Sequence, residues 1–141
     1  MPPSELASTL EHRSGLLGLT GTGEMKAVLE AEASGNPDAA LAVEVYLHRL
    51  RSSIAAMAAS MDGLDALVFT GGVGEKSSVV RWRAAAGLGF LGVGLDPESN
   101  EQATPDAEIG GLDAAVRSFV VTAREDLEIA RGVRQVLHAG Q

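Results

Sequence analysis

The stretch Leu64-Asp65-Ala66-Leu67-Val68-Phe69-Thr70-Gly71-Gly72-Val73-Gly74-Glu75 carries most of the structural information in this 141-residue chain. Residues 66–69 form a short apolar run that contains Val and Phe, which predicts a buried strand covered on both faces. The three glycines at positions 71, 72 and 74 permit positive φ angles and leave room for a ligand beside the backbone. A helix is predicted to follow over residues 77–86, with Gly87 as its stop.

A strand, a glycine turn and a helix start together form an arrangement that suits phosphate, because backbone N–H groups and the positive end of the helix dipole face the anion. Such turns also occur where only a tight bend is needed, so both interpretations stay open. The turn is not a Walker A loop, because Lys76 follows Glu75 and not a glycine. The Gly-x-Gly-x-x-Gly at residues 87–92 follows a predicted helix instead of a strand, so we interpret it as a helix stop and a turn.

The composition limits the classes of partner. A hydrophobic content of 45% is enough for a buried core in a domain of this length. No apolar run approaches the roughly 20 residues that span a bilayer, so no membrane partner is expected. The absence of cysteine excludes disulfides and thiolate metal sites and fits a cytoplasmic protein.

The net charge of −8 argues against binding to nucleic acid, which needs clustered Lys and Arg. It also means that a nucleotide phosphate has to be held by local backbone donors and a metal ion, not by the field of the whole protein. A glycine turn combined with a carboxylate-bound Mg²⁺ meets this requirement.

The first third of the chain is predicted to contain short helices and one loop. A short helix is predicted within residues 1–13, and the apolar, glycine-rich segment 14–23 is predicted to be a close-packed loop. A helix is then expected over residues 24–33, burying apolar side chains and stopping at Gly35. The buried side chains of that helix are expected to be Met25, Val28 and Leu29.

The longest helix is predicted to begin at Asn36, which is a favourable N-cap, with Pro37 at the first helical position. It is expected to end near residues 62–63, with His48 and the Arg49–Arg51 pair on or beside its solvated face. Its apolar residues recur at alternating spacings of four and three, which predicts one buried face. They are Val43, Leu47, Leu50, Ile54, Met57 and Met61.

In the second half, the cluster Arg81-Trp82-Arg83 is interpreted as a helix surface with one packed tryptophan. Residues 97–111 are predicted to be a polar loop, and residues 119–121 a second short buried strand. A final helix is predicted over residues 125–138. Its apolar face contains Leu127, Ala130, Val133 and Leu137.

Strands that alternate with helices indicate an α/β fold with at least part of a parallel sheet. Two clear strands are few for a free-standing sheet, so the sheet is expected to be small and incomplete.

Four segments of the chain resemble the C-terminal part of acetate kinases, in the same order and over nearly the whole length. They are Ser14–Leu19, Val68–Glu75, Gly87–Gly92 and Asp126–Arg131. The resemblance implies part of an actin-like, ribonuclease H-like ATPase domain. It also implies the family's reaction, in which ATP and acetate give acetyl phosphate and ADP.

The resemblance also implies which residues bind the nucleotide. The family's nucleotide loop Gly-Ile-Gly-Glu-Asn corresponds to Gly72, Val73, Gly74, Glu75 and Lys76, with lysine in place of the asparagine. The family's Asp-Met-Arg segment beside the nucleoside corresponds to Glu24, Met25 and Lys26.

One metal ligand is implied as well. Glu125 corresponds to the first glutamate of a Glu-Glu-Leu motif that holds Mg²⁺ in the family. From the residues alone, an acidic side chain in the first turn of a helix is also explained as a partner of the helix dipole.

The resemblance places residues 1–141 as the C-terminal nucleotide-binding segment of an acetate kinase whose upstream domain is absent from this sequence. The family's acetate pocket and catalytic groups lie in that upstream part, so no catalytic residue is assigned and the chain alone is expected to be nearly inactive. The full-length enzyme is expected to be a cytoplasmic homodimer.

Two alternatives remain from the sequence. One is an isolated ATP-binding or interaction module without catalysis, and the other is a segment of a propionate or butyrate kinase. Acetate-dependent turnover of ATP separates the first alternative from the kinase hypothesis.

Overall fold

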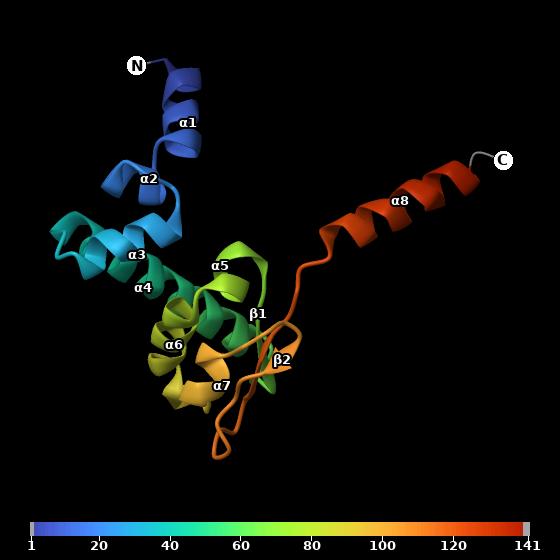
Figure 1. The fold of residues 1–141 in the computed structure, drawn as a ribbon. Coiled ribbons are helices and arrows are strands. Elements are labelled where there is room, and N and C mark those ends of the chain that lie inside the picture. Colours follow the sequence, from blue (N-terminus) through green and yellow to red (C-terminus); the bar gives the residue numbers. More distant parts are fainter. Residues whose placement is uncertain (1, 140–141) are drawn as a thin grey trace.

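The computed structural model describes residues 2–139, in which helices pack on a small mixed sheet (Figure 1). The N-terminal elements are α1 (Pro3–His12), α2 (Gly15–Thr20), α3 (Met25–Ala33) and α4 (Pro37–Ser60). They are followed by β1 (Ala66–Phe69), α5 (Gly71–Lys76), α6 (Ser78–Ala86) and the 3₁₀ helix η1 (Gly89–Leu91). The last elements are α7 (Pro97–Glu101), β2 (Ala107–Glu108), β3 (Arg117–Val120) and α8 (Glu125–Ala139). Within the described residues, no helix is long and apolar enough to cross a lipid bilayer.

The sheet has the strand order β1-β3-β2. Strands β1 and β3 pair in parallel, with Leu67 opposite Ser118 and Phe69 opposite Val120, whereas β2 pairs antiparallel with β3. Both predicted strands and the parallel pairing are therefore confirmed, although β3 begins and ends slightly earlier than expected.

The prediction that β1 is covered on both faces is wrong. Leu67 and Phe69 are buried, but Ala66 and Val68 are exposed, with half of the Val68 surface accessible. The reason is that the apolar core lies on one side of the strand, where side chains from α3, α4 and α6 join Leu67 and Phe69.

Helix α4 begins as predicted. The Asn36 side chain accepts hydrogen bonds from the backbone N–H groups of Asp38, at 2.9 Å, and Ala39, at 3.0 Å. Pro37 occupies the first turn, where its missing N–H costs nothing. These contacts fix the start of the 24-residue helix against which α2, α3 and α6 pack.

The apolar face of α4 is not buried along its whole length. Val43 and Leu47 are fully buried, whereas Met57 and Met61 are about three-fifths exposed, so the prediction of a continuous buried face is wrong. Leu50 and Ile54 are half-buried against the core, and only Met57 and Met61, at the end of the helix, lie outside the set of side chains that pack there. As expected, His48 is exposed.

Two segments that are predicted to be loops contain helices. Residues 14–23 contain helix α2, which is capped at its C-terminus by Gly21 with a φ of +76°. Within residues 97–111, Asp96 accepts a hydrogen bond from the Ser99 N–H at 2.8 Å and so caps α7. Asp96 followed by Pro97 is the same type of helix start as Asn36 followed by Pro37 at α4. It is missed from the sequence because the polar composition of this segment suggests a loop.

The interpretation of the Arg81-Trp82-Arg83 cluster is also wrong. Arg81 is only 2% exposed, whereas Trp82 is 42% exposed. The guanidinium of Arg81 is buried because hydrogen-bond acceptors from α5 and α7 surround it. Trp82, the neighbouring residue, is not packed in the core.

Helix α8 confirms the predicted final helix and projects away from the sheet (Figure 1). Its apolar face is exposed: Leu127, Val133 and Leu137 each keep more than half of their accessible surface. Within residues 125–137, whose side chains the structure describes, the helix therefore adds none to the core.

Candidate functional site

Two predicted site segments leave the sheet at the same edge. Because β1 and β3 are parallel neighbours, the turn after Phe69 and the segment after Val120 both lie at the carboxyl ends of the strands. The pairing continues past β3, because the Val121 N–H donates to the Phe69 carbonyl oxygen at 2.9 Å. In open α/β sheets, ligands bind outside this edge. The sheet topology therefore brings residues 72–76 and Glu125 to one side of the molecule.

The glycine turn is itself helical. Thr70 is extended and precedes the six-residue helix α5, at a place where the sequence predicts a separate turn before the next helix. Of the three glycines, Gly71 alone has a positive φ, +72°. Gly74 is needed for a different reason: a Cβ there would lie 3.2 Å from the Phe69 carbonyl carbon, so a side chain would crowd the strand end.

The Glu75 carboxylate joins the two segments. Its Oε1 atom accepts hydrogen bonds from the Gly71 N–H at 2.9 Å and from the Ala123 N–H at 2.8 Å. The first bond satisfies one of the unpaired donors at the start of α5, and the second ties α5 to the segment between β3 and α8. Within the predicted nucleotide loop, the Oε1 atom of Glu75 is thus bound to the protein backbone.

Arg81 holds the other end of α5. Its Nη1 donates to the carbonyl oxygens of Gly74 and Glu75, each at 3.0 Å. Its Nε and Nη2 donate to the side chain and carbonyl oxygen of Asn100, at 2.8 and 2.6 Å. Burial lowers the pKa of Arg81, and the nearby Glu101 opposes that shift. Sequence reasoning misses this residue as a site component because its acceptors lie on two other elements, which helical periodicity does not reveal.

Asp106 holds the segment between β3 and α8 from a second direction. Its Oδ1 accepts a hydrogen bond from the Thr122 N–H at 2.9 Å, and its Oδ2 pairs with Arg124. These contacts lower the pKa of the Asp106 carboxyl, the backbone bond first and the Arg124 guanidinium second. The carboxylates of Glu75 and Asp106 therefore fix the segment that leads from β3 to Glu125. Sequence reasoning does not identify Asp106, which lies in a polar stretch with no pattern that marks it.

The predicted nucleotide loop has a mixed exposure. Gly72 and Lys76 are exposed, while Val73 is half-buried against the core. Glu125 is exposed at the first position of α8. These residues are accessible to a ligand at the sheet edge, and their contact with a nucleotide stays a prediction.

The predicted nucleoside segment is not joined to this edge. Met25 is 6% exposed and belongs to the core. The Nζ atom of Lys26 lies 4.0 Å from the Oε1 atom of Glu30 on the same helix. The Glu24 backbone N–H is bonded to the Thr22 hydroxyl. Among residues 2–139, no hydrogen bond or ion pair connects residues 24–26 with residues 72–76.

Glu125 could hold Mg²⁺ only together with ligands that residues 2–139 do not supply, such as water and substrate phosphates. The part of the chain described here contains no group of three or more His, Asp or Glu side chains that could hold a metal ion. Mg²⁺ retains several waters and is commonly bound by one or two carboxylates together with substrate phosphates. The single exposed carboxylate of Glu125 is compatible with that type of site.

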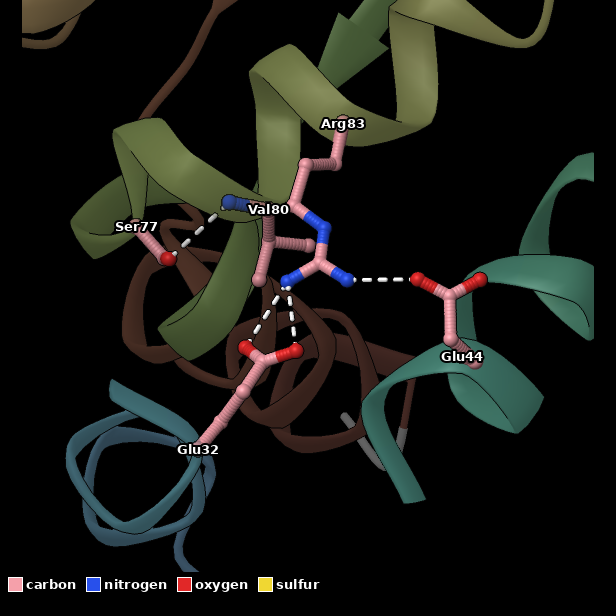
Figure 2. Close-up of polar contacts among 5 residues, drawn as sticks. All are labelled: Glu32, Glu44, Ser77, Val80 and Arg83. Carbon is pink, nitrogen blue, oxygen red and sulfur yellow. Dashed lines mark hydrogen bonds and ion pairs between the residues drawn. The ribbon is translucent and has the colours of Figure 1, made fainter. Parts of the chain in front are cut away.

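Arg83, on α6, has a structural role because it connects this helix to α3 and α4. Figure 2 shows its guanidinium between Glu32 on α3 and Glu44 on α4. Its Nη1 lies 2.8 and 3.0 Å from the two Glu32 oxygens, and its Nη2 lies 2.6 Å from Glu44. The Glu32 hydrogen bonds are the main reason that the pKa of Arg83 is raised. This ion-pair network links α6 to the helices on which it packs.

Known proteins with similar sequences are acetate kinases. The chain is 46% identical over 138 residues to an acetate kinase of Synechococcus sp., which covers 97% of this chain and 34% of that protein. It is 47% identical to an acetate kinase of Gloeobacter violaceus over 90% of this chain and 32% of that protein. The chain thus spans about a third of the length of these relatives.

Solved structures agree with the sequences. An acetate kinase from Porphyromonas gingivalis matches with a TM-score of 0.87 and 30% identity, over 97% of this chain and 35% of that one. A propionate kinase from Francisella tularensis matches with a TM-score of 0.85 and 32% identity, over 92% of this chain and 33% of that one. The helices and small sheet therefore form part of the actin-like ATPase fold of these enzymes, which confirms the predicted fold class. The model of the Acetokinase family matches residues 1–131, and this chain belongs to that family.

Proposed function

We propose that this chain is the nucleotide-binding segment of an acetate kinase. The observation that carries the proposal is the position of two candidate groups, the turn 72–76 and Glu125, at the carboxyl ends of adjacent parallel strands. The high identity to acetate kinases over nearly the whole chain supports the same role. In this proposal the backbone of residues 72–76 approaches the phosphates of ATP, and Glu125 holds Mg²⁺.

The proposed reaction transfers the γ-phosphoryl group of ATP to acetate. A carboxylate oxygen of acetate forms a bond to the γ-phosphorus, and the bond from that phosphorus to the oxygen bridging to the β-phosphate breaks. The leaving electron pair stays on ADP, and the other product is acetyl phosphate. In phosphoryl transfer, the protein contributes positioning and electrostatic stabilisation of the transferred group.

The residues of this chain contribute to positioning. The exposed glycine at position 72 leaves space for close approach of a phosphate to the backbone, since a Cβ at this position would meet no other atom within 4 Å. Lys76 is exposed in the last turn of α5 and carries a positive charge that a phosphate oxygen can pair with. Bound Mg²⁺ supplies neutralisation of phosphate charge.

The catalytic groups are not assigned to this chain. It spans about a third of the length of its relatives, and phosphoryl transfer needs groups that stabilise the equatorial oxygens of the transferred phosphate. We therefore expect little acetate-dependent ATP consumption by the chain alone. A homodimeric, cytoplasmic full-length enzyme is part of the same proposal.

Propionate is the alternative acceptor. The structural match to a propionate kinase is nearly as close as the match to an acetate kinase. A comparison of ATP consumption with acetate and with propionate, after addition of the remaining part of a full-length relative, distinguishes the two acceptors.

The nucleotide role is tested by calorimetric titration of the chain with Mg-ATP. The two informative variants are Gly72→Val, which places a branched side chain at the proposed phosphate approach, and Glu125→Ala, which removes the metal ligand. Gly89→Val and Asp126→Ala are matched controls: Gly89 also has free space around it, and Asp126 is the neighbouring acidic residue in the first turn of α8.

We expect weak binding by the unmodified chain, reduced by both informative variants and unchanged in both controls. Equal weakening by Asp126→Ala and Glu125→Ala would indicate a general charge effect and contradict the metal assignment. A folded chain that does not bind Mg-ATP would contradict the proposed function of the segment by itself.

A further inference from the structure

We propose that Glu75 is a positioning residue that couples the nucleotide loop to the metal carboxylate Glu125, and that its side chain does not contact the nucleotide. This inference rests on the proposed function, because it assigns a role within that site. Its geometric basis is the pair of backbone hydrogen bonds that Glu75 Oε1 accepts from Gly71, after β1, and from Ala123, after β3.

The two donors belong to segments that are far apart in the sequence. Gly71 begins α5, directly after β1, and Ala123 lies between β3 and α8. Ala123 is two residues before Glu125, so a bond at Ala123 restricts where the Glu125 backbone can lie. The Oε1 atom of Glu75 is therefore hydrogen-bonded both to the predicted phosphate-binding segment and to the segment that leads to the predicted metal ligand.

Glu75 is itself held at its backbone. Arg81, which is 2% exposed, donates to the carbonyl oxygens of both Gly74 and Glu75 at 3.0 Å. The main chain of Glu75 is thus held by Arg81, and its carboxylate is held by the two N–H groups of Gly71 and Ala123.

The segment after β3 is held at two successive N–H groups. Asp106 accepts from Thr122, and Glu75 accepts from Ala123. The Asp106 contact fixes the segment relative to the loop before β2, whereas the Glu75 contact fixes it relative to α5. Loss of Glu75 should therefore uncouple α5 from Glu125 without freeing the segment completely.

The chemistry of the contact favours an acceptor role over a charge role. A carboxylate that faced the phosphates of ATP would repel them, whereas an oxygen bonded to two N–H groups is oriented toward the protein. An amide oxygen can accept the same two hydrogen bonds without a charge. Glu75→Gln should therefore preserve much of what Glu75→Ala removes.

The first measurement needs no nucleotide. Amide hydrogen exchange at Ala123 is compared in the unmodified chain and in Glu75→Ala, Glu75→Gln and Glu98→Ala. Glu98 is an exposed carboxylate on α7 that accepts a hydrogen bond from Gln102, and it serves as the matched control. We expect about tenfold faster exchange at Ala123 in Glu75→Ala, substantial rescue in Glu75→Gln, and no change in Glu98→Ala. Unchanged exchange in Glu75→Ala would overturn the proposal.

The second measurement is the factor by which Mg²⁺ tightens ATP binding. We expect Glu75→Ala to reduce this factor severalfold, because the loop and Glu125 are no longer held together, and Glu75→Gln to restore most of it. Equal loss in Glu75→Gln and Glu75→Ala would show that the charge acts on the ligand or metal directly, which overturns the positioning role.

The two measurements separate failure of this inference from failure of the proposed function. Slow exchange at Ala123 that depends on Glu75, combined with no ATP binding by the unmodified folded chain, overturns the nucleotide role and with it the coupling. ATP binding that responds to Mg²⁺ equally in the unmodified chain and in Glu75→Ala overturns the coupling while the nucleotide role stands.

Discussion

Arg81 and Asn100 form a buried pair in which both the side chain and the main chain of the asparagine accept from one guanidinium. The Nε–Oδ1 distance is 2.8 Å, and Nη2 lies 2.6 Å from the Asn100 carbonyl oxygen. Asn100 is 3% exposed, and its own amide nitrogen donates to the Ser78 carbonyl oxygen at 3.1 Å. The pair connects α6 and α7, and through the remaining guanidinium nitrogen it reaches the end of α5.

Replacement of Arg81 by methionine should destabilise the fold by about 3 kcal/mol, because buried carbonyl and amide oxygens then lose their donors. Urea unfolding monitored by circular dichroism measures this change. Arg49→Met is the matched control, since Arg49 is exposed on α4, and it should change the free energy of unfolding by less than about 0.5 kcal/mol. Similar values for the two variants would contradict the structural role of Arg81.

The carboxyl of Asp106 should titrate below its ordinary pKa of 3.8. Its folded-state pKa is lowered, so the stabilising contact with Thr122 and Arg124 is complete above pH 3.8 and is lost as the pH falls through the folded-state value. An NMR titration of the Thr122 amide shift reports the midpoint. In Arg124→Gln the midpoint should move upward but stay below 3.8, because the backbone hydrogen bond is the larger cause.

Asp96 is the internal comparison in the same titration. Its pKa is lowered by the side-chain hydroxyl and backbone N–H of Ser99, and neither contact involves Arg124. The Asp96 midpoint should therefore be unchanged in Arg124→Gln. A shift of both carboxyls would indicate a general electrostatic effect in place of the local contact.

Gly92→Ala should be markedly more destabilising than Gly89→Ala. Gly92 has a φ of +87°, and a Cβ at that position would lie 2.8 Å from the Cβ of Ala115. A Cβ at Gly89 would meet no other atom within 4 Å, and Gly89 has no positive φ. We expect a loss of about 2 kcal/mol for the first substitution and less than about 1 kcal/mol for the second. Thermal unfolding of both variants provides the comparison, and equal melting temperatures would refute it.

Of the two carboxylates that bind Arg83, Glu32 should contribute more to stability than Glu44. Both Glu32 oxygens contact Nη1 and the side chain is 22% exposed, whereas Glu44 uses one oxygen and is 63% exposed (Figure 2). Glu32→Gln should therefore cost about 1.5 kcal/mol, and Glu44→Gln less than about 0.5 kcal/mol. Urea unfolding at low and high salt tests this order, since only the Glu44 contribution should disappear with added salt.

The sequence is sufficient for elements that are specified locally. Asn36 and Pro37 identify the start of α4, and the short apolar run identifies β1, because capping and burial depend on neighbours along the chain. The same reasoning fails at Val68, because its exposure depends on which faces of a strand other elements cover. A continuous apolar run does not contain that information.

The sequence proposes residues for the candidate site, but it does not reveal the contacts that connect them. The glycine turn and Glu125 follow from local pattern and family resemblance. The bond from Ala123 to Glu75 joins residues 48 positions apart, and Arg81 is buried by acceptors on two other elements. Such polar contacts across distant segments leave no periodic signal in the sequence, so they become visible only in the folded chain.

The parallel pairing of β1 and β3 also has a consequence for the order of folding. Helices α3 and α4 are neighbours in sequence and can form a local hairpin early, whereas the two strands are separated by α5, α6, η1, α7 and β2. Closing so long a loop costs more entropy than forming the local hairpin, so we expect the sheet to assemble late. Because the Glu75–Ala123 bond spans the same closure, we expect the edge that carries the candidate site to form in a late folding step, after the α3–α4 hairpin.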